Sequence, residues 1–352
     1  MHGKWEKFAE LYRKVAPAVF LLAVLLLLWL SSYAYAPGPL QTGQETTVII
    51  PAPSSFSAIE ERLAGAGVLY SDLRFRILAK LMGVNKGLHP GEYRFRDRPT
   101  PYQILRQLYK GSLIRHPLTI PEGANLQQIG DLLVKENWTS APEFQAAVTD
   151  PKFITELGLK YPTLEGYLFP DTYFLERGVF NLRAFLTIMV TQTRKILAAT
   201  GAATGLPAYG LNAHQILTLA SIVEKETGLA AERPLIAKVF LNRLRDGMRL
   251  QTDPTVIYGL HSFNGNLTKK DLQTPSPYNT YLIQGLPPGP IANPGQAAIQ
   301  AVMAPATNGD YYYFVSKNDG SHYFSRFLAE HNRAVNRYQR QPPTIKRKSV
   351  RL

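Results

Sequence analysis

The segment Val48-Ile-Ile-Pro-Ala-Pro-Ser-Ser-Phe-Ser-Ala-Ile-Glu-Glu-Arg-Leu63 returns in weakened form 70 residues later, as Leu118-Thr-Ile-Pro-Glu-Gly-Ala-Asn-Leu-Gln-Gln-Ile-Gly-Asp-Leu-Leu133. Each copy has a short apolar run, a turn at proline, a Ser or Asn that can cap a helix, and then apolar residues at i, i+3 and i+7. The pattern predicts a strand followed by a helix in both places. Two copies are too few for a solenoid, which needs at least about three.

The first copy continues into the elements of a small unit. A second helix is expected at 71–82, and a second strand near Glu92–Phe95 follows His89-Pro-Gly91. The order strand, helix, helix, strand predicts a β-α-α-β unit over residues 46–98, and a further helix at 101–109 leads onward.

The chain beyond residue 116 is expected to be mostly helical, which makes the whole an α+β protein. Two aromatic runs flank Asn318-Asp-Gly320 and predict a β-hairpin near the C-terminal end. Residues 246–293 are rich in Pro, Gly, Asn, Thr and Tyr, and so long a stretch with little regular structure is usually functional. Asn293 and Pro294 form a helix start signal. Helices are predicted at 182–199, 212–227, 233–245, 294–303 and 328–340.

The N-terminal part of the chain contains residues 15–36 without a charged side chain. That length exceeds the roughly 20 residues needed to cross a bilayer, and basic residues precede it, so 1–14 should stay in the cytoplasm. Ala34-Tyr-Ala36 before Pro37 resembles a signal-peptidase site, which leaves a cleaved signal peptide as the alternative. The apolar run is longer than a signal peptide's core of roughly 7–15 residues, which favours an uncleaved anchor. Residues 37–45 are expected to be a linker.

The net charge of +13 comes mainly from the two ends of the chain. Residues 1–14 carry +2 and the last twenty-two residues carry +7, which leaves +4 for residues 15–330. A nucleic-acid site would require basic residues on a folded face with interleaved aromatic residues, and this pattern is not seen. The basic tail at 341–352 is assigned no role.

The sequence also excludes several kinds of chemistry. It has no cysteine, so disulfides, thiol nucleophiles and lipoprotein acylation are ruled out. It contains none of the phosphate-loop, dinucleotide-binding, nucleophile-elbow or HExxH motifs. Neither a cofactor nor a metal site is therefore expected. Carboxylate chemistry on a surface rich in Tyr, Asn and Gln remains, and such a surface suits sugars.

The most informative carboxylates lie in His214-Gln-Ile-Leu-Thr-Leu-Ala-Ser-Ile-Val-Glu-Lys-Glu-Thr227. At 100° per residue the apolar residues form a broad arc, with Glu224 and Glu226 beside it on opposite flanks. A carboxyl group in such a position is partly desolvated, which raises its pKa and keeps it protonated as a general acid. The pattern does not separate Glu224 from Glu226, and it also fits a solvated helix end.

Three further segments carry candidate site residues, although each taken singly fits core packing or an ordinary loop equally well. They are Glu165-Gly-Tyr-Leu-Phe-Pro-Asp-Thr-Tyr173, Met248-Arg-Leu-Gln-Thr-Asp-Pro-Thr-Val-Ile-Tyr258 and Ser276-Pro-Tyr-Asn-Thr-Tyr281. The candidates within them are Glu165, Tyr167, Asp171, Gln251, Asp253, Tyr278, Asn279 and Tyr281.

Taken together, these strings resemble the MltG (YceG-like) endolytic murein transglycosylases. The resemblance runs from the apolar segment to about residue 338, and the strings occur in the family's order. The strings are Glu165-Gly-Tyr-Leu-Phe-Pro-Asp-Thr-Tyr173, Ala220-Ser-Ile-Val-Glu-Lys-Glu-Thr227, Val239-Phe-Leu-Asn-Arg-Leu244, Met248-Arg-Leu-Gln-Thr-Asp-Pro-Thr-Val-Ile-Tyr-Gly259, Tyr278-Asn-Thr-Tyr281, Gly285-Leu-Pro-Pro-Gly-Pro-Ile291 and Glu330-His-Asn332.

The resemblance implies a plan for the chain: a membrane anchor at 15–36, a LysM-like module at 46–115 and a catalytic domain at 116–340. It implies cleavage of the β-1,4 bond between N-acetylmuramic acid and N-acetylglucosamine inside glycan strands, leaving 1,6-anhydro ends. The family's catalytic glutamate falls on Glu226. Supporting or sugar-binding roles are expected for Glu165, Tyr167, Asp171, Glu224, Gln251, Asp253, Tyr278, Asn279 and Tyr281.

The family setting further suggests a place and partners. The expected place is the bacterial plasma membrane, with the catalytic domain on the periplasmic side. The expected partners are glycan strands, the bilayer and peptidoglycan synthases, with nascent strands being terminated. Two other interpretations stay open: a hydrolase that uses water and a second acid, and a wall-binding scaffold without activity.

Overall fold

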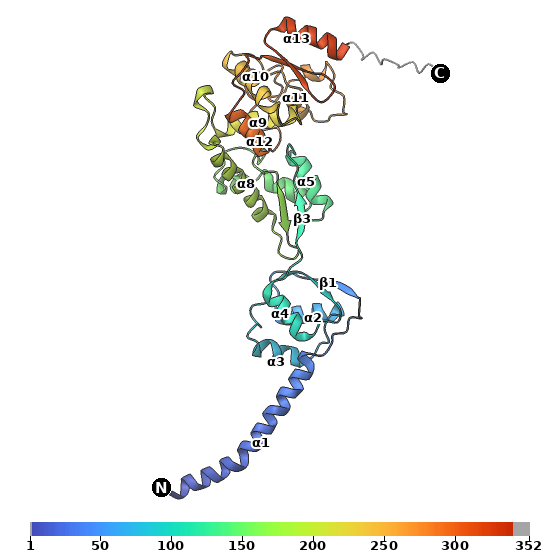
Figure 1. The fold of residues 1–352 in the computed structure, drawn as a ribbon, viewed down its shortest axis with the longest axis vertical. Helices are drawn as coiled ribbons and strands as arrows, with labels where there is room; N and C mark the ends of the chain where they lie inside the picture. The colour runs from blue at the N-terminus through green and yellow to red at the C-terminus, as the bar shows by residue number, and fades with distance from the viewer. Residues whose placement is uncertain (1, 341–352) are drawn as a thin grey trace, which may run out of the picture. The chain divides into compact units, whose positions relative to one another are not determined.

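The computed structural model describes residues 2–340, and the chain divides into two compact units (Figure 1). The first unit comprises the chain up to Leu118 together with Phe174–Phe180, and the second comprises Thr119–Tyr173 and the chain from Asn181 onward. No pattern in the sequence indicated that Phe174–Phe180 belongs to the first unit. The basic tail at 341–352 lies outside the described residues.

The first unit contains the expected β-α-α-β order. After α1 (His2–Ala34) come β1 (Glu45–Ile50), α2 (Phe56–Gly65), α3 (Leu73–Leu81), β2 (Gly91–Arg96) and α4 (Pro101–Lys110). Strands β1 and β2 are antiparallel, with Glu45 opposite Arg96 and Ile50 opposite Gly91. The predicted unit is therefore confirmed, with strand boundaries shifted by a few residues.

Short caps and one apolar core hold this unit together. Ser55 and Asp72 accept hydrogen bonds from the first turns of α2 and α3, and Thr100 forms a reciprocal capping box with Gln103. The two strands and three short helices bury a common set of side chains, which includes Leu63, Phe75, Tyr93, Phe95, Ile104, Leu105 and Leu108. Tyr33 and Ala34, at the end of α1, belong to the same core.

Helix α1 contains a 25-residue segment, Glu10–Ala34, that is long and apolar enough to cross a membrane, with mean hydropathy 2.4. A signal sequence would satisfy the same criterion. Pro17 lies inside this helix, and the side chains from Val19 to Leu28 are mostly exposed.

The second copy of the repeat predicted from the sequence is confirmed where the chain passes from the first unit to the second. Helix α5 (Leu126–Lys135) begins and ends 70 residues after α2, and Asn125 caps it in a box with Gln128. The strand before it, β3 (His116–Thr119), pairs with β4 (Thr172–Leu175) in a two-stranded sheet.

The rest of the second unit is mainly helical, as expected. Its main helices are α6 (Ala141–Val148), α7 (Pro151–Glu156), α8 (Leu182–Ala199), α9 (Ala213–Glu226), α10 (Arg233–Arg245), α11 (Asp253–Gly259), α12 (Gln296–Met303) and α13 (Leu328–Val335). The predicted hairpin is formed by β5 (Tyr313–Ser316) and β6 (His322–Ser325), with Tyr313 opposite Ser325.

The bounds of α12 and α13 differ from the prediction, and α3 and α9 are each shorter than predicted by one or two residues at their ends. Helix α12 begins at Gln296 with Gly295 at its cap position, because the buried Asn293 side chain instead accepts a hydrogen bond from Leu168 N at 2.8 Å. At the other end, α13 stops at Val335 and a short π-helical turn follows at Asn336–Arg340. Within residues 246–293, α11 is the longest regular element and the remainder is irregular.

The central position of α9 yields a stability prediction. Leu219 of α9 is fully buried, whereas Ile188 of α8 is 57% exposed. We expect Leu219→Ala to lower the free energy of unfolding by about 2–5 kcal/mol because it removes apolar contacts and leaves a cavity. Ile188→Ala should change it by less than about 1 kcal/mol. Urea unfolding checks both variants, and equal losses would contradict this packing.

Candidate active site

Helix α9 is fixed at both ends and along its apolar face. Asn212 Oδ1 accepts a hydrogen bond from Gln215 N at 3.0 Å, and Gln215 Oε1 accepts one from Asn212 N at 2.9 Å. Every residue from Ile216 to Val223 is buried. Ser221 Oγ accepts a hydrogen bond from Ile291 N at 3.0 Å, which ties the Pro-rich loop before α12 to the helix.

The two glutamates at the end of α9 point to different surroundings. Glu224 forms an ion pair with Arg233 at 3.0 Å and accepts a hydrogen bond from Gly295 N at 3.0 Å. Glu226 instead accepts a hydrogen bond from the buried Thr252 hydroxyl. Glu224 therefore joins α9 to α10 and α12, whereas Glu226 is turned toward the loop that precedes α11.

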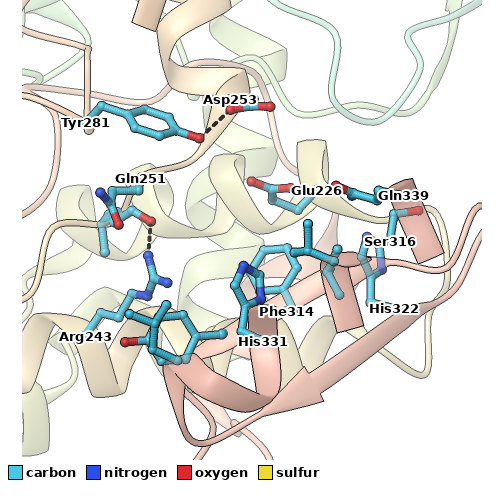
Figure 2. A pocket seen from close by; sticks show the side chains of 15 residues that line it. Glu226, Arg243, Gln251, Asp253, Tyr281, Phe314, Ser316, His322, His331 and Gln339 are labelled. Atoms are coloured by element: carbon cyan, nitrogen blue, oxygen red, sulfur yellow. Dashed lines mark hydrogen bonds between the residues drawn. The ribbon is translucent and has the colours of Figure 1, made fainter. Parts of the chain in front are cut away.

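Glu226 opens into a cavity of about 450 Å³, and Figure 2 shows side chains converging on it from several elements. Its polar lining includes Gln251 from the loop before α11, Asp253 from the first turn of α11, Tyr281 from the irregular segment, and His322 from the hairpin. The complete lining is Glu226, Arg243, Leu250, Gln251, Asp253, Tyr281, Tyr313, Phe314, Val315, Ser316, His322, Leu328, His331, Val335 and Gln339.

The surroundings of the Glu226 carboxyl favour its neutral form. Burial raises its pKa to about 7, and the nearby Asp253 carboxylate acts in the same direction. The hydrogen bond from Thr252 and the charges of His322 and Arg243 act in the opposite direction. A carboxyl with a pKa near neutrality can both give and take a proton under physiological conditions.

The loop before α11 is held in an unusual conformation. Gln251 has φ of 50°, which is uncommon for a residue other than glycine, and such strain often accompanies a functional constraint. Arg243 helps to fix this loop by donating to Leu250 O at 2.7 Å, and it also donates to Tyr312 O at 2.7 Å. The one guanidinium thus connects the loop to the segment before β5.

Tyr281 and Asp253 form a pair on the same wall of the cavity. Tyr281 Oη donates to Asp253 Oδ1 at 2.6 Å (Figure 2). The position of Tyr281 depends on Asn279, whose Oδ1 accepts from Tyr281 N at 3.0 Å and whose Nδ2 donates to Leu272 O and Thr274 O. Asn279 is fully buried, so it shapes the loop and does not line the cavity.

The hairpin and α13 supply two histidines with different partners. Glu232 accepts a hydrogen bond from His322 N at 2.8 Å. It also lies 2.7 Å from His322 Nδ1, and accepts a second hydrogen bond when that nitrogen carries the proton. His331 Nδ1 is buried and has no hydrogen-bond partner, and burial and the charge of Arg243 lower the pKa of this histidine. A carboxylate therefore orients the first imidazole, whereas the second has a buried ring nitrogen without a hydrogen-bond partner.

A family comparison matches this chain over residues 48–337 to the model of the YceG-like family. The chain belongs to the YceG-like family. The matched residues include the β-α-α-β unit from Val48 onward. They also include every residue that lines the cavity except Gln339.

Individual members of the YceG-like family are similar over most of the chain. The endolytic murein transglycosylase of Bacillus subtilis is 34% identical over 317 residues, which cover 85% of this chain and 87% of that protein. The endolytic murein transglycosylase of Streptococcus pneumoniae D39 is 30% identical over 82% of this chain, which spans 57% of that protein's length. A crystal structure of a YceG-like protein from Listeria monocytogenes has a TM-score of 0.58 and 34% identity, and the match covers 83% of this chain and 99% of that one.

The cavity of this YceG-like chain contains four of the site residues predicted from the sequence: Glu226, Gln251, Asp253 and Tyr281. Tyr167 lies elsewhere, because its hydroxyl is 3.0 Å from Nδ1 of His214 in the first turn of α9, at the opposite end from Glu226. Tyr278 packs on Tyr258 with ring centroids 4.8 Å apart. Neither Tyr167 nor Tyr278 is part of the cavity lining.

The two acids of the 165–173 segment also lie outside the cavity. Glu165 is buried and accepts hydrogen bonds from Leu126 N at 3.2 Å, Tyr258 Oη at 3.0 Å and Asn293 Nδ2 at 3.2 Å, and burial raises its pKa to about 7. Asp171 is exposed and accepts a hydrogen bond from the following Thr172 N at 2.7 Å. Glu165 therefore joins α5, α11 and the loop before α12, whereas Asp171 bonds locally.

The sequence analysis gave no role to Arg243, His322 or His331, although all three line the cavity. Arg243 and His331 stand in two of the strings quoted above, and His322 stands in the predicted hairpin. A search for titratable residues inside those strings could have found Arg243 and His331, but not His322. Among residues 2–340, no three His, Asp or Glu side chains are grouped so that they could hold a metal ion.

The two glutamates of α9 yield opposite stability predictions. The pKa of Glu226 is about 7 in the folded protein, and its ordinary value is 4.5. Between these two pH values the folded state keeps a proton that the unfolded chain has already lost. The free energy of unfolding therefore falls as the pH rises from about 4.5 to about 7. We expect Glu226→Gln to be more stable than wild type at pH 8, by up to about 3 kcal/mol, with the gain vanishing near pH 5.

The matched control is Glu224→Gln, which breaks the ion pair with Arg233 and should cost about 3 kcal/mol at pH 8. Chemical denaturation at pH 5, 6, 7 and 8 checks both variants. A Glu226→Gln variant that is less stable than wild type at pH 8 would contradict the desolvated carboxyl.

Proposed function

We propose that this chain is an endolytic murein transglycosylase that cleaves the β-1,4 bond between N-acetylmuramic acid and N-acetylglucosamine within glycan strands. The observation that carries the proposal is the Glu226 carboxyl, desolvated and opening into a cavity lined by tyrosines, histidines and glutamines. Membership in the YceG-like family and the names of the relatives in Bacillus subtilis and Streptococcus pneumoniae support it.

The chemistry needs one group that acts first as an acid and then as a base. Neutral Glu226 protonates the glycosidic oxygen as the bond to C1 of the muramoyl residue breaks. The resulting carboxylate takes the proton of the C6 hydroxyl, whose oxygen attacks C1 and closes the 1,6-anhydro ring. The nucleophile is part of the substrate, so no water has to be positioned. A pKa of about 7 suits both steps.

Neighbouring groups are proposed to serve the same reaction. The Asp253 carboxylate faces the cavity and can stabilise the positive charge that develops at C1. Gln251 and Tyr281 can bond to and stack on sugar rings. Glu165, Tyr167, Asp171, Glu224, Tyr278 and Asn279 are proposed to support the site from outside the cavity.

The other parts of the chain are proposed to place the enzyme at its substrate. The β-α-α-β unit is assigned as a LysM-like, wall-binding module, and α1 as an uncleaved anchor in the plasma membrane with the catalytic domain on the periplasmic side. In that setting the enzyme would end nascent glycan strands next to peptidoglycan synthases.

A hydrolase is the second candidate, because the cavity holds a second carboxylate. Asp253 could activate a water molecule, and the product would then carry an ordinary reducing end. Mass spectrometry of muropeptides separates the two, since an anhydro end contains one water less. A preponderance of reducing ends would favour the hydrolase.

The first test removes the proton donor. Glu226→Gln keeps an acceptor for Thr252 but cannot supply a proton, so we expect kcat on purified glycan strands to fall by about 10²–10⁴. Glu122→Gln, a change at a half-exposed acid outside the cavity, should retain activity. Full activity of Glu226→Gln would overturn the assignment, and inactivity of wild type as well would favour a binding scaffold.

The second test uses the charges around Glu226. The wild-type enzyme should lose kcat/KM above pH 7 because the acid form is depleted. His322→Gln removes a charge that lowers the pKa of Glu226, so its alkaline limb should move to higher pH. Asp253→Asn removes a charge that raises this pKa, so its limb should move to lower pH.

Arg243, whose charge also lowers the pKa of Glu226, is unchanged in both variants. The pH dependence of the residual activity of each variant is the measurement. Shifts in the same direction for His322→Gln and Asp253→Asn would contradict the proposed electrostatics.

A further inference from the structure

Helix α3 carries apolar side chains on two faces. Phe75, Leu78 and Ala79 are buried in the core of the first unit. On the outer face, Leu73 is 67% exposed and Leu81 is 70% exposed. A helix that covers a core normally presents a polar face to solvent, so a second apolar stripe requires an explanation.

The outer stripe is continuous along the helix. Leu73, Ile77 and Leu81 are spaced at i, i+4 and i+8, and at 100° per residue they lie within one narrow sector. Ile77 is partly exposed between the two leucines, and Tyr70, just before the helix, is 61% exposed. These four residues, Tyr70, Leu73, Ile77 and Leu81, are called the α3 stripe below.

The end of α1 is fastened to the start of this stripe. Tyr33 Oη donates a hydrogen bond to Tyr70 O at 3.1 Å. The Arg74 guanidinium lies over the rings of Trp29 and Tyr33, at 5.3 and 4.6 Å from their centroids. Figure 1 shows α3 lying at the end of the unit from which α1 leaves. Tyr70 and the N-terminal end of α3 are therefore at the level of the last two turns of α1.

Those last turns are where a membrane-spanning helix would leave the hydrocarbon. Residues 15–34 of α1 carry no charge, and twenty residues at 1.5 Å each span about 30 Å, the thickness of a bilayer core. Trp29 and Tyr33 then fall near the lipid–water interface, where aromatic side chains are enriched. The α3 stripe starts at that same interface.

Cationic side chains border the α3 stripe. Arg74, Arg76 and Lys80 flank it on α3, and Lys80 is exposed. Arg74 pairs with Asp72 at 2.7 Å and Arg76 with Glu60 at 2.7 Å, which leaves Lys80 as the charge on this face with no ion pair among the described residues. Apolar side chains bordered by lysine and arginine are typical of helices that lie in a lipid headgroup layer.

We propose that the α3 stripe is a membrane-contact face that rests in the outer surface of the same bilayer that α1 crosses. The inference rests on the proposed anchoring by α1. Its consequence is that the β-α-α-β unit does not swing freely on its anchor: α1 and the α3 stripe hold it in one orientation against the lipid.

The absence of cysteine from the chain makes a direct test practicable. Single-cysteine variants Leu73→Cys and Leu81→Cys of the full chain, labelled with an environment-sensitive fluorophore, are reconstituted into liposomes of phosphatidylcholine and phosphatidylglycerol. Lipids carrying a quencher near the headgroup or deep in the acyl chain are then added in separate samples. Thr47→Cys, at an exposed position of β1, is the matched control within the unit, and Leu21→Cys reports on α1.

We expect the probes at Leu73 and Leu81 to be quenched by the shallow quencher at least about twofold more than the probe at Thr47. The probe at Leu21 should respond to the deep quencher. Equal, weak quenching at Leu73, Leu81 and Thr47 together with a quenched Leu21 would overturn the membrane-contact face and leave the anchor intact. An unquenched Leu21 would overturn the anchoring itself and the inference with it.

Discussion

The desolvation of one carboxyl group, that of Glu226, is the constraint on which the functional part of this structure depends. A carboxyl in water would be ionised at neutral pH and could not donate a proton. The last turn of α9 places Glu226 beneath the loop before α11, where burial raises its pKa to about 7. The buried residues from Ile216 to Val223 keep that turn in place, so the chemistry of the site is linked to the packing of the helix.

The two acids of Glu-Lys-Glu differ in their surroundings: Glu224 fixes the helix, whereas Glu226 is the proposed proton donor. Glu224 is neutralised by Arg233 and by a backbone N–H at the start of α12, so it locks α9 to its neighbours. Glu226 has a single hydroxyl partner among the described residues and opens into the cavity. Two residues along a helix are about 200° apart, and this rotation places one carboxylate in a structural ion pair and the other in the site.

Much of the architecture followed from local patterns, because capped helices and the Asn318-Asp-Gly turn depend on nearby residues. The 70-residue repeat predicted the caps, and with them the starts, of α2 and α5. The site was harder to predict, since its members meet only through tertiary contacts: helical periodicity could not separate Glu224 from Glu226. It also could not indicate that Tyr167 lies at the far end of α9, or that His322 is held by Glu232 from ninety residues away. The start of α12 was misjudged because Asn293 bonds to distant partners and does not cap the helix.

The most direct test of whether Glu226 is desolvated is the titration of its carboxyl group. Infrared difference spectra of wild type minus Glu226→Gln, recorded across pH, isolate the C=O stretch of this one protonated side chain, because Glu165, whose pKa is also near 7, cancels. We expect a carboxylic-acid band that disappears as the pH rises, with a midpoint near pH 7. A midpoint near the ordinary value of 4.5 would show that the Glu226 carboxyl is solvated, and would contradict its desolvation by burial.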